Sequence, residues 1–146
     1  MPQKKSYIYL DHAATTPLRP EVLRAMKPYL TKWYGNASAL YSQGVEAHTA
    51  IESARETIAN LIHTNDDSII FTSGGTESCN MAVLGAARKH RLQGNHIIST
   101  AVEHHAVLNA CKQLEREGFE VTYLPVDRYG FVTVDQVKKA LRPTTI

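Results

Sequence analysis

The amino-acid sequence predicts an α/β fold in which helices cover both faces of a mainly parallel sheet, giving three layers, α/β/α. After residue 69, short apolar runs of strand length alternate at least three times with longer segments of helical pattern. This alternation is typical of βαβ units. The run at residues 69–71 is wholly apolar, as expected for a strand that is buried on both faces. The first run ends at two glycines, and a helical pattern begins directly after them.

The first part of the chain is predicted to be mostly helical. Residues 6–10 form a short strand-like run, and residues 11–17, which end at a proline, are expected to be irregular. A helix is predicted at 21–33, with Pro20 in its first turn. The clearest helix covers residues 45–63, where apolar residues recur with a period close to 3.6.

The second part carries the predicted sheet. Strands are expected at residues 69–71, 96–100 and 119–124, and residues 144–146 resemble the start of a further strand. The helices between them are expected at residues 76–91, 106–117 and 134–141. Thr133 with Gln136 three residues later predicts a capping box at the start of the last helix.

Composition excludes several classes of function. The 146 residues are 43% hydrophobic and 21% charged, which is typical of a globular protein. Sixteen basic residues stand against 14 acidic ones without a basic stripe, so nucleic-acid binding is disfavoured. No apolar run has the length of a membrane span. Cys79 and Cys111 are too few for a disulfide framework, which favours a reducing, cytoplasmic location.

The segment at residues 72–78 is a candidate phosphate site. Gly74 and Gly75 allow the backbone to approach a ligand closely, and the first amides of the following helix have no helical partner. The helix dipole and the hydroxyls of Ser73, Thr76 and Ser78 favour an anion at the same point. The segment lacks the lysine of a P-loop and the spacing of a dinucleotide fingerprint. An ordinary strand-to-helix turn is therefore the alternative interpretation.

The pair His104-His105 follows the next strand and has three interpretations. Metal binding is weakly supported, since no third ligand is evident. A histidine that stacks on a ligand or moves protons at the end of the sheet is better motivated. The third interpretation is a helix-terminal histidine without chemistry. Because ligands bind at the carboxyl ends of parallel strands, the Ser73–Thr76 segment and His104 are expected to share one pocket. Both cysteines are expected to be buried and inert.

Six segments together resemble the cysteine desulfurases, which are pyridoxal-phosphate enzymes of the aspartate aminotransferase fold. They are YLDHAATTP, YGNASALYSQG, IESARETIANLI, IIFTSGGTESCN, HIISTAVEHHAVLNACKQLEREGFEVTYLPVD and LRPTTI. The resemblance covers nearly the whole chain. It implies the N-terminal part of an aspartate-aminotransferase-like large domain. Residues 1–18 would be an N-terminal segment that packs with the small domain, and residues 19–146 a partial cofactor-binding domain that ends at the start of a strand.

The resemblance also implies roles for individual residues. Gly75 and Thr76 would hold the phosphate of pyridoxal 5′-phosphate, and His104 would stack on the pyridine ring and act in proton transfer during catalysis. Residues 11–17 and the loop at Asn36 would line the approach, near the interface of a homodimer. No metal is implied. Tyr41 replaces a histidine found in many relatives, and Cys79 replaces a common aspartate.

A cysteine desulfurase converts L-cysteine to L-alanine and transfers persulfide sulfur to acceptor proteins for iron–sulfur cluster assembly or tRNA thiolation. The Schiff-base lysine of the family lies in a Ser-x-His-Lys context, and no lysine of this sequence has that setting. Neither Cys79 nor Cys111 is expected to carry the persulfide, so the isolated chain is expected to be inactive. Two alternatives remain: a selenocysteine lyase or another pyridoxal-phosphate aminotransferase-class enzyme, and a non-catalytic module that binds a phosphorylated ligand or a partner.

Overall fold

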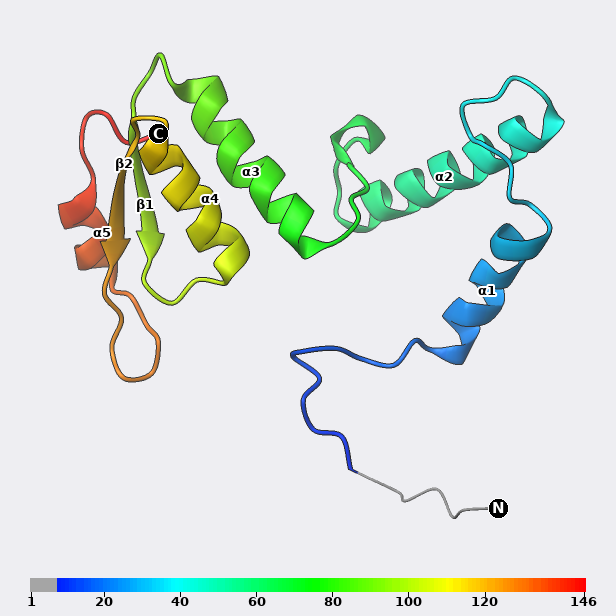
Figure 1. Cartoon of the computed structure of the whole chain (residues 1–146), viewed down its shortest axis with the longest axis horizontal. Coiled ribbons are helices and arrows are strands. Elements are labelled where there is room, and N and C mark those ends of the chain that lie inside the picture. The colour runs from blue at the N-terminus through cyan, green and yellow to red at the C-terminus, as the bar shows by residue number, and fades with distance from the viewer. Residues whose placement is uncertain (1–7) are drawn as a thin grey trace. The chain divides into compact units, whose positions relative to one another are not determined.

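The computed structural model describes residues 8–146 and divides into two compact units (Figure 1). Residues 8–70 are called the N-terminal unit below, and residues 71–146 the C-terminal unit. Each is described by itself. None of the helices within residues 8–146 is both long and apolar enough to cross a membrane.

The N-terminal unit contains α1 (Pro20–Thr31), α2 (Ser42–Leu61) and the short 3₁₀ helix η1 (Asp66–Ser68). The helix α1 begins at its proline, as predicted. The helix α2 begins three residues earlier than predicted, because the carbonyl oxygen of Tyr41 accepts hydrogen bonds from the amides of Gly44 and Val45. The strand predicted at residues 6–10 falls partly outside the described residues, and residues 8–10 form no strand.

The apolar faces of both helices remain largely exposed. On α1, Val22, Leu23, Met26 and Leu30 are all exposed. On α2 the larger apolar side chains are also exposed, and the buried residues are Gly44, Ala47 and Ala59. The helical pattern of this region is therefore confirmed, but within the unit it packs little apolar surface.

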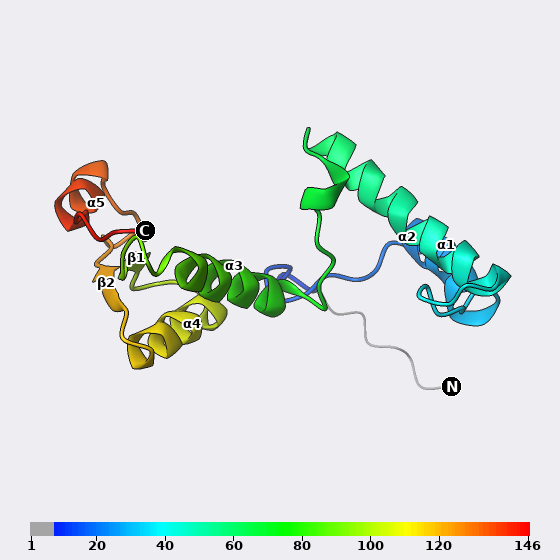
Figure 2. The same ribbon diagram turned by 90° about the horizontal axis from the view of Figure 1, so that it is seen from above.

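The C-terminal unit is built from α3 (Gly75–His90), β1 (His96–Thr100), α4 (His105–Arg116), β2 (Glu120–Leu124) and α5 (Val134–Ala140). The strands β1 and β2 are parallel, with registers from His96–Glu120 to Thr100–Leu124. Figures 1 and 2 show α3 and α4 on one side of the strands and α5 on the other. This arrangement confirms the predicted α/β/α layering and the parallel sheet.

The core of the C-terminal unit lies where α3 and α4 meet the sheet. Leu114, Phe119 and Ala87 are buried together, and Val83, Leu84 and Ile97 pack against them. The helix α4 ends two residues before Gly118, whose φ of 90° lies in the left-handed region that glycine adopts easily. The predicted capping box of Thr133 and Gln136 is present at the start of α5.

The C-terminal residues add a third strand position beside β1, as predicted. The His96 amide donates to the carbonyl oxygen of Thr144 at 2.9 Å, and the Ile146 amide donates to the His96 carbonyl oxygen at 3.0 Å. These bonds form an isolated parallel bridge between His96 and Thr145. The strand β1 is therefore the central one, with β2 on one side and residues 144–146 on the other.

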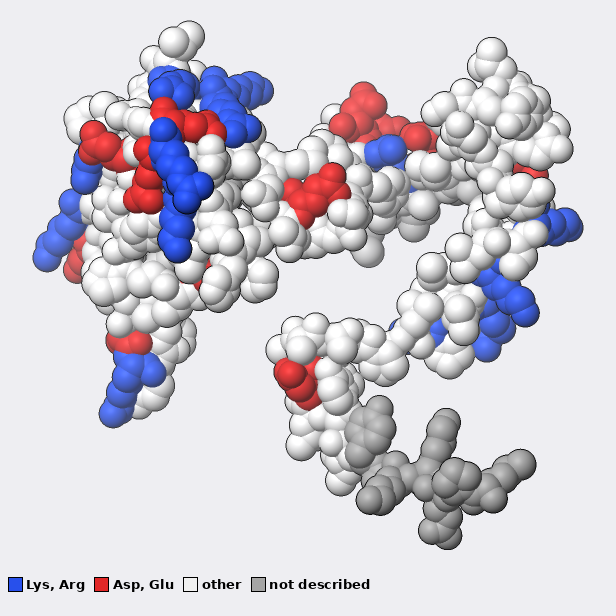
Figure 3. Space-filling view, in the orientation of Figure 1, with Lys and Arg blue, Asp and Glu red and all other residues white. Residues whose placement is uncertain are grey.

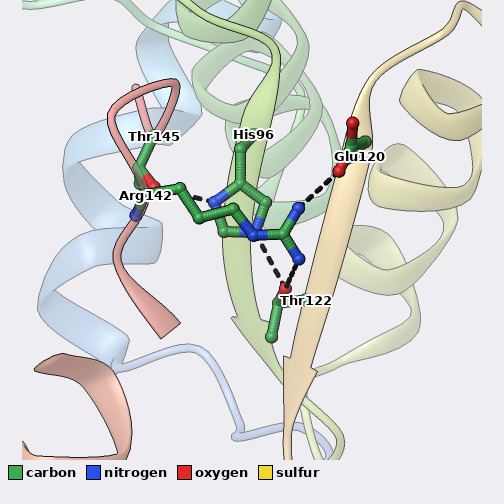
Figure 4. Close-up of polar contacts among 5 residues, drawn as sticks. All are labelled: His96, Glu120, Thr122, Arg142 and Thr145. Atoms are coloured by element: carbon green, nitrogen blue, oxygen red, sulfur yellow. Dashed lines mark hydrogen bonds and ion pairs between the residues drawn. The ribbon is translucent and has the colours of Figure 1, made fainter. Parts of the chain in front are cut away.

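His96 joins all three strand positions through its side chain (Figure 4). Its ring is fully buried, with Nδ1 2.7 Å from the Thr145 hydroxyl and Nε2 2.8 Å from the Thr122 hydroxyl. Arg142 lies beside the ring and pairs with Glu120 on β2. Burial lowers the pKa of His96, the Arg142 charge lowers it further, and Glu120 opposes the shift. His96 is thus held as a neutral polar link across the sheet.

The prediction of a strand at residues 69–71 is wrong. These residues precede the glycine turn but belong to no strand, and the sheet consists of β1 and β2. Ile69 has the extended dihedrals of a strand, φ −95° and ψ 123°, and its carbonyl oxygen accepts a hydrogen bond from Arg55 instead of from a neighbouring strand. Apolar β-branched residues favour extended backbone, but a strand also needs a neighbour in register.

Candidate functional site

The N-terminus of α3 presents free backbone amides. Gly74 is the N-cap residue, with extended backbone (φ 161°, ψ 179°), and it has no side chain that could cap the helix. The first amide of this turn to bond backward is that of Ser78, which donates to the Gly74 carbonyl oxygen at 3.1 Å. Within residues 8–146, no hydrogen bond uses the amides of Gly75, Thr76 or Glu77. Three donors are therefore available to a ligand.

The space in front of these amides is open. Beyond the adjacent residues and the helix's own backbone, a Cβ atom added to Gly74 or to Gly75 would meet no atom within 4 Å. The Thr76 hydroxyl lies on the same turn and forms no hydrogen bond with the other described residues. Free amides, a free hydroxyl and the positive end of a helix dipole match the chemistry of a phosphate group. This terminus therefore fits the phosphate of a cofactor.

The other side of this turn is held by side chains. Glu77 Oε2 accepts a hydrogen bond from the Ser73 amide at 2.6 Å, and this bond lowers the pKa of the Glu77 carboxyl group. The hydroxyls of Thr72 and Ser78 lie 2.7 Å apart, and each is within 3.3 Å of the Gly74 carbonyl oxygen. The sequence interpretation did not assign Glu77 a function, although a glutamate at the third helical position is a known capping signal.

His104 is the N-cap residue of α4. Its Nδ1 accepts a hydrogen bond from the Ala106 amide at 3.1 Å, so Nδ1 is unprotonated and Nε2 carries the proton of the neutral ring. The His105 ring lies edge-on to it, with centroids 6.2 Å apart. Thr100 at the end of β1 donates to Glu103 Oε1 at 3.0 Å, which anchors the connecting loop. His104 thus lies at a helix terminus, and its Nε2 remains available to a ligand.

The two helix N-termini lie at the same end of the C-terminal unit. In Figures 1 and 2, α3 and α4 run side by side in similar directions, and α4 begins beyond the carboxyl end of β1. Among the described residues, no hydrogen bond or ring contact joins His104 to Gly75 or Thr76. The structure therefore brings the predicted residues to one end of the unit without linking them directly. No three His, Cys, Asp or Glu side chains within residues 8–146 form a group that could hold a metal ion.

The remaining predicted residues have local roles. Cys111 is buried on α4, and burial raises the pKa of its thiol, which fits an inert residue. Cys79 on α3 is only half-buried. Residues 11–17 and Asn36 belong to the N-terminal unit, where the Asn36 side chain accepts a hydrogen bond from the Ser38 amide at 3.0 Å.

Charged side chains of both signs adjoin on the C-terminal unit (Figure 3). Arg88 forms two hydrogen bonds to the Glu117 carboxylate, at 2.6 and 3.0 Å. Together with a hydrogen bond from the Gln113 side chain, they lower the pKa of Glu117 to about 2. Arg91 donates to the Glu117 carbonyl oxygen and lies over the Phe119 ring. These contacts fix the end of α4 that lies away from the candidate site.

Comparison with known proteins gives consistent matches over almost the whole chain. The family model described as "Aminotransferase class-V" matches residues 8–146. A cysteine desulfurase IscS from Dictyoglomus turgidum is 59% identical over 142 residues, which are 97% of this chain and 36% of the relative. The solved structure titled "NifS-like protein" has a TM-score of 0.89 and 36% identity, and covers 94% of this chain and 38% of that one.

A second solved structure, titled "SspA in complex with cysteine", has a TM-score of 0.86 and 41% identity, and covers 94% of this chain and 40% of that one. The chain thus spans little more than a third of the length of the relatives that it matches.

Proposed function

Because the chain belongs to the class-V aminotransferase family, whose members are pyridoxal-phosphate enzymes, we propose that it forms the N-terminal part of a cysteine desulfurase. The observation that carries this proposal is the 59% identity, over nearly the whole chain, with a protein named as a cysteine desulfurase. The open N-terminus of α3 supports it independently, since it offers the donors that a cofactor phosphate requires.

Gly75 and Thr76 hold the phosphate in this proposal. Their amides and the Thr76 hydroxyl would donate hydrogen bonds to its oxygens, aided by the dipole of α3. His104 would lie against the pyridine ring and would act in proton transfer through Nε2, the ring nitrogen that the Ala106 amide leaves free. Pyridoxal phosphate, when bound, supplies an electron sink for the bonds of an amino-acid substrate. The protein contributes the binding, the orientation and the proton transfer.

The substrate proposed is L-cysteine, which would be converted to L-alanine while its sulfur passes to an acceptor protein for iron–sulfur cluster assembly or tRNA thiolation. The structural relative titled with bound cysteine supports this substrate class. A homodimer in a cytoplasmic setting is the form that we propose for the enzyme. The division into residues 1–18 and a cofactor-binding domain from residue 19 stays a prediction.

Product analysis of the full-length protein tests this function. We expect equal amounts of sulfide and L-alanine from L-cysteine in the presence of a thiol reductant, and both should depend on added pyridoxal phosphate after the cofactor is removed. The same assay with selenocysteine in place of cysteine distinguishes a cysteine desulfurase from a selenocysteine lyase. A protein that forms selenide and L-alanine from selenocysteine, but no sulfide from cysteine, would be a selenocysteine lyase.

The 146 residues by themselves are expected to release no sulfide from cysteine. None of their lysines has the Ser-x-His-Lys context, and Cys111 is buried with a raised thiol pKa. Turnover by this chain alone, measured as alanine formation, would contradict that part of the proposal.

A further inference from the structure

Glu77 lies in the first turn of α3 and reaches back to the segment that precedes the helix. Its Oε2 accepts a hydrogen bond from the Ser73 amide at 2.6 Å. This bond spans Gly74 and Gly75, and glycine is the residue with the greatest conformational freedom. A connection across two adjacent glycines therefore restricts the most flexible part of the turn.

The connection leaves the open side of the turn free. In a complete capping box, the N-cap side chain would accept a hydrogen bond from an amide of the first turn. Gly74 cannot do so, because it has no side chain. Glu77 also departs from the box, because it accepts from the amide of Ser73, one residue before the N-cap. The amides of Gly75 and Thr76 stay available to an anion.

The negative charge of Glu77 would not by itself assist the binding of a phosphate at this turn. The hydrogen bond from Ser73 lowers the pKa of the carboxyl group, so Glu77 is negatively charged at neutral pH. A negative charge is favourable at a free helix N-terminus, but it repels a phosphate that binds to the same turn. The length of the side chain and its acceptor oxygen are therefore the properties that assist binding of a phosphate.

We propose that Glu77 is a positioning residue for the cofactor phosphate, because its hydrogen bond to Ser73 holds the two-glycine turn in the shape that keeps the amides of Gly75 and Thr76 free. This inference rests on the proposed function, in which that turn holds the phosphate of pyridoxal 5′-phosphate. It adds a residue that does not touch the cofactor but sets the geometry of those that do.

The test compares two ligands and two substitutions in the full-length protein after removal of its cofactor. Dissociation constants for pyridoxal 5′-phosphate and for pyridoxal, which lacks the phosphate, are measured by equilibrium dialysis. Glu77→Asp keeps the charge at the helix terminus but is one methylene too short to reach Ser73. Glu77→Gln keeps the length and an acceptor oxygen but removes the charge.

We expect Glu77→Asp to weaken binding of pyridoxal 5′-phosphate roughly fivefold, the usual size of a lost capping bond. Glu77→Gln should stay within about twofold of the wild type, since its amide oxygen still accepts from Ser73. The affinity for pyridoxal should be the same in all three proteins.

Three results would overturn this inference. Glu77→Asp could bind the phosphorylated cofactor as tightly as the wild type does, both substitutions could weaken it equally, or the affinity for pyridoxal could fall in parallel. A different result identifies failure of the proposed cofactor site itself: a wild-type protein that binds pyridoxal 5′-phosphate no more tightly than pyridoxal.

Discussion

The two units of this chain contain helices of similar amphipathic pattern but differ in how far those helices are buried. In the C-terminal unit, Leu114 of α4 is fully buried against α3 and the sheet. In the N-terminal unit, Leu30 of α1 is 67% exposed, although it lies on an equally regular apolar face. The periodicity of a sequence shows which face of a helix is apolar, but the packing depends on whether other elements cover that face.

The helices of the two units also differ in whether a side chain caps their N-terminus. The helix α4 begins with a side-chain cap from His104, whereas the N-cap residues of α1 and α2, Arg19 and Tyr41, make no such bond. The helix α3 also lacks a side-chain cap, but its terminus carries the glycines of the candidate site. The C-terminal unit thus combines a closed core with one helix end that is left open for a ligand.

The largest effect is expected in the core. Leu114→Ala removes a side chain with no exposed surface and should lower the local unfolding free energy of α4 by about 3 kcal/mol. Leu30→Ala on α1 is the matched control and should cost less than about 1 kcal/mol, because its side chain is mostly exposed. Hydrogen exchange of the helix amides measures each unit separately. If both substitutions lowered the unfolding free energy equally, the two units would not differ in how far their helices are buried.

The buried polar link of the C-terminal unit should give a smaller effect that depends on pH. His96→Gln loses at least one of the two threonine bonds and should lower stability by about 2 kcal/mol at pH 7.5. The folded-state pKa of His96 is lowered, so its contribution is complete above the unfolded value of about 6.5. As the pH falls below that value, the unfolded state binds a proton that the folded state excludes, and the contribution is lost.

Urea unfolding of both proteins between pH 7.5 and pH 5 tests this sign. The wild type should lose its advantage over the His96→Gln variant as the pH falls, with a slope no steeper than about 1.4 kcal/mol per pH unit, the limit for one proton. Parallel stability curves for the two proteins would show that His96 does not titrate differently on unfolding.

The cap of α4 should give the smallest effect on stability. His104→Ala removes the acceptor of the Ala106 amide and should cost about 1 kcal/mol, whereas His104→Asn restores an N-cap acceptor and should cost little. Both variants lack the imidazole ring, so both should lose the same share of affinity for pyridoxal. Thermal unfolding and pyridoxal binding thus separate the structural role of His104 from its proposed role in the site. A wild-type affinity for pyridoxal in both variants would remove that second role.

Local patterns in the sequence were sufficient to predict most elements of the C-terminal unit. The capping box at Thr133 and the glycine that follows the end of α4, Gly118, depend on residues that are close in sequence or carry their own conformational preference. The strand predicted at residues 69–71 failed for the opposite reason, since a strand requires a neighbour that its own residues do not specify.

The sequence likewise predicted the candidate site only in part. The glycine turn and Thr76 follow from local chemistry, and the resemblance to a known family added their ligand. The contact from Glu77 to Ser73 and the capping bond of His104 depend on side-chain directions, which periodicity does not determine. The roles of Gly75, Thr76 and His104 toward the cofactor remain proposals.

The proposed phosphate site at the N-terminus of α3 is tested most directly by Thr76→Val, which keeps the shape of the side chain and the backbone amide but removes the hydroxyl. In the full-length protein, the dissociation constant of pyridoxal 5′-phosphate should rise at least about tenfold, as expected for a lost hydrogen bond to a charged group. The affinity for pyridoxal should not change. Thr49→Val on α2, whose hydroxyl bonds to its own helix, is the control and should change neither affinity. Unchanged binding of pyridoxal 5′-phosphate by the Thr76→Val variant would contradict the assignment of this turn as the phosphate site.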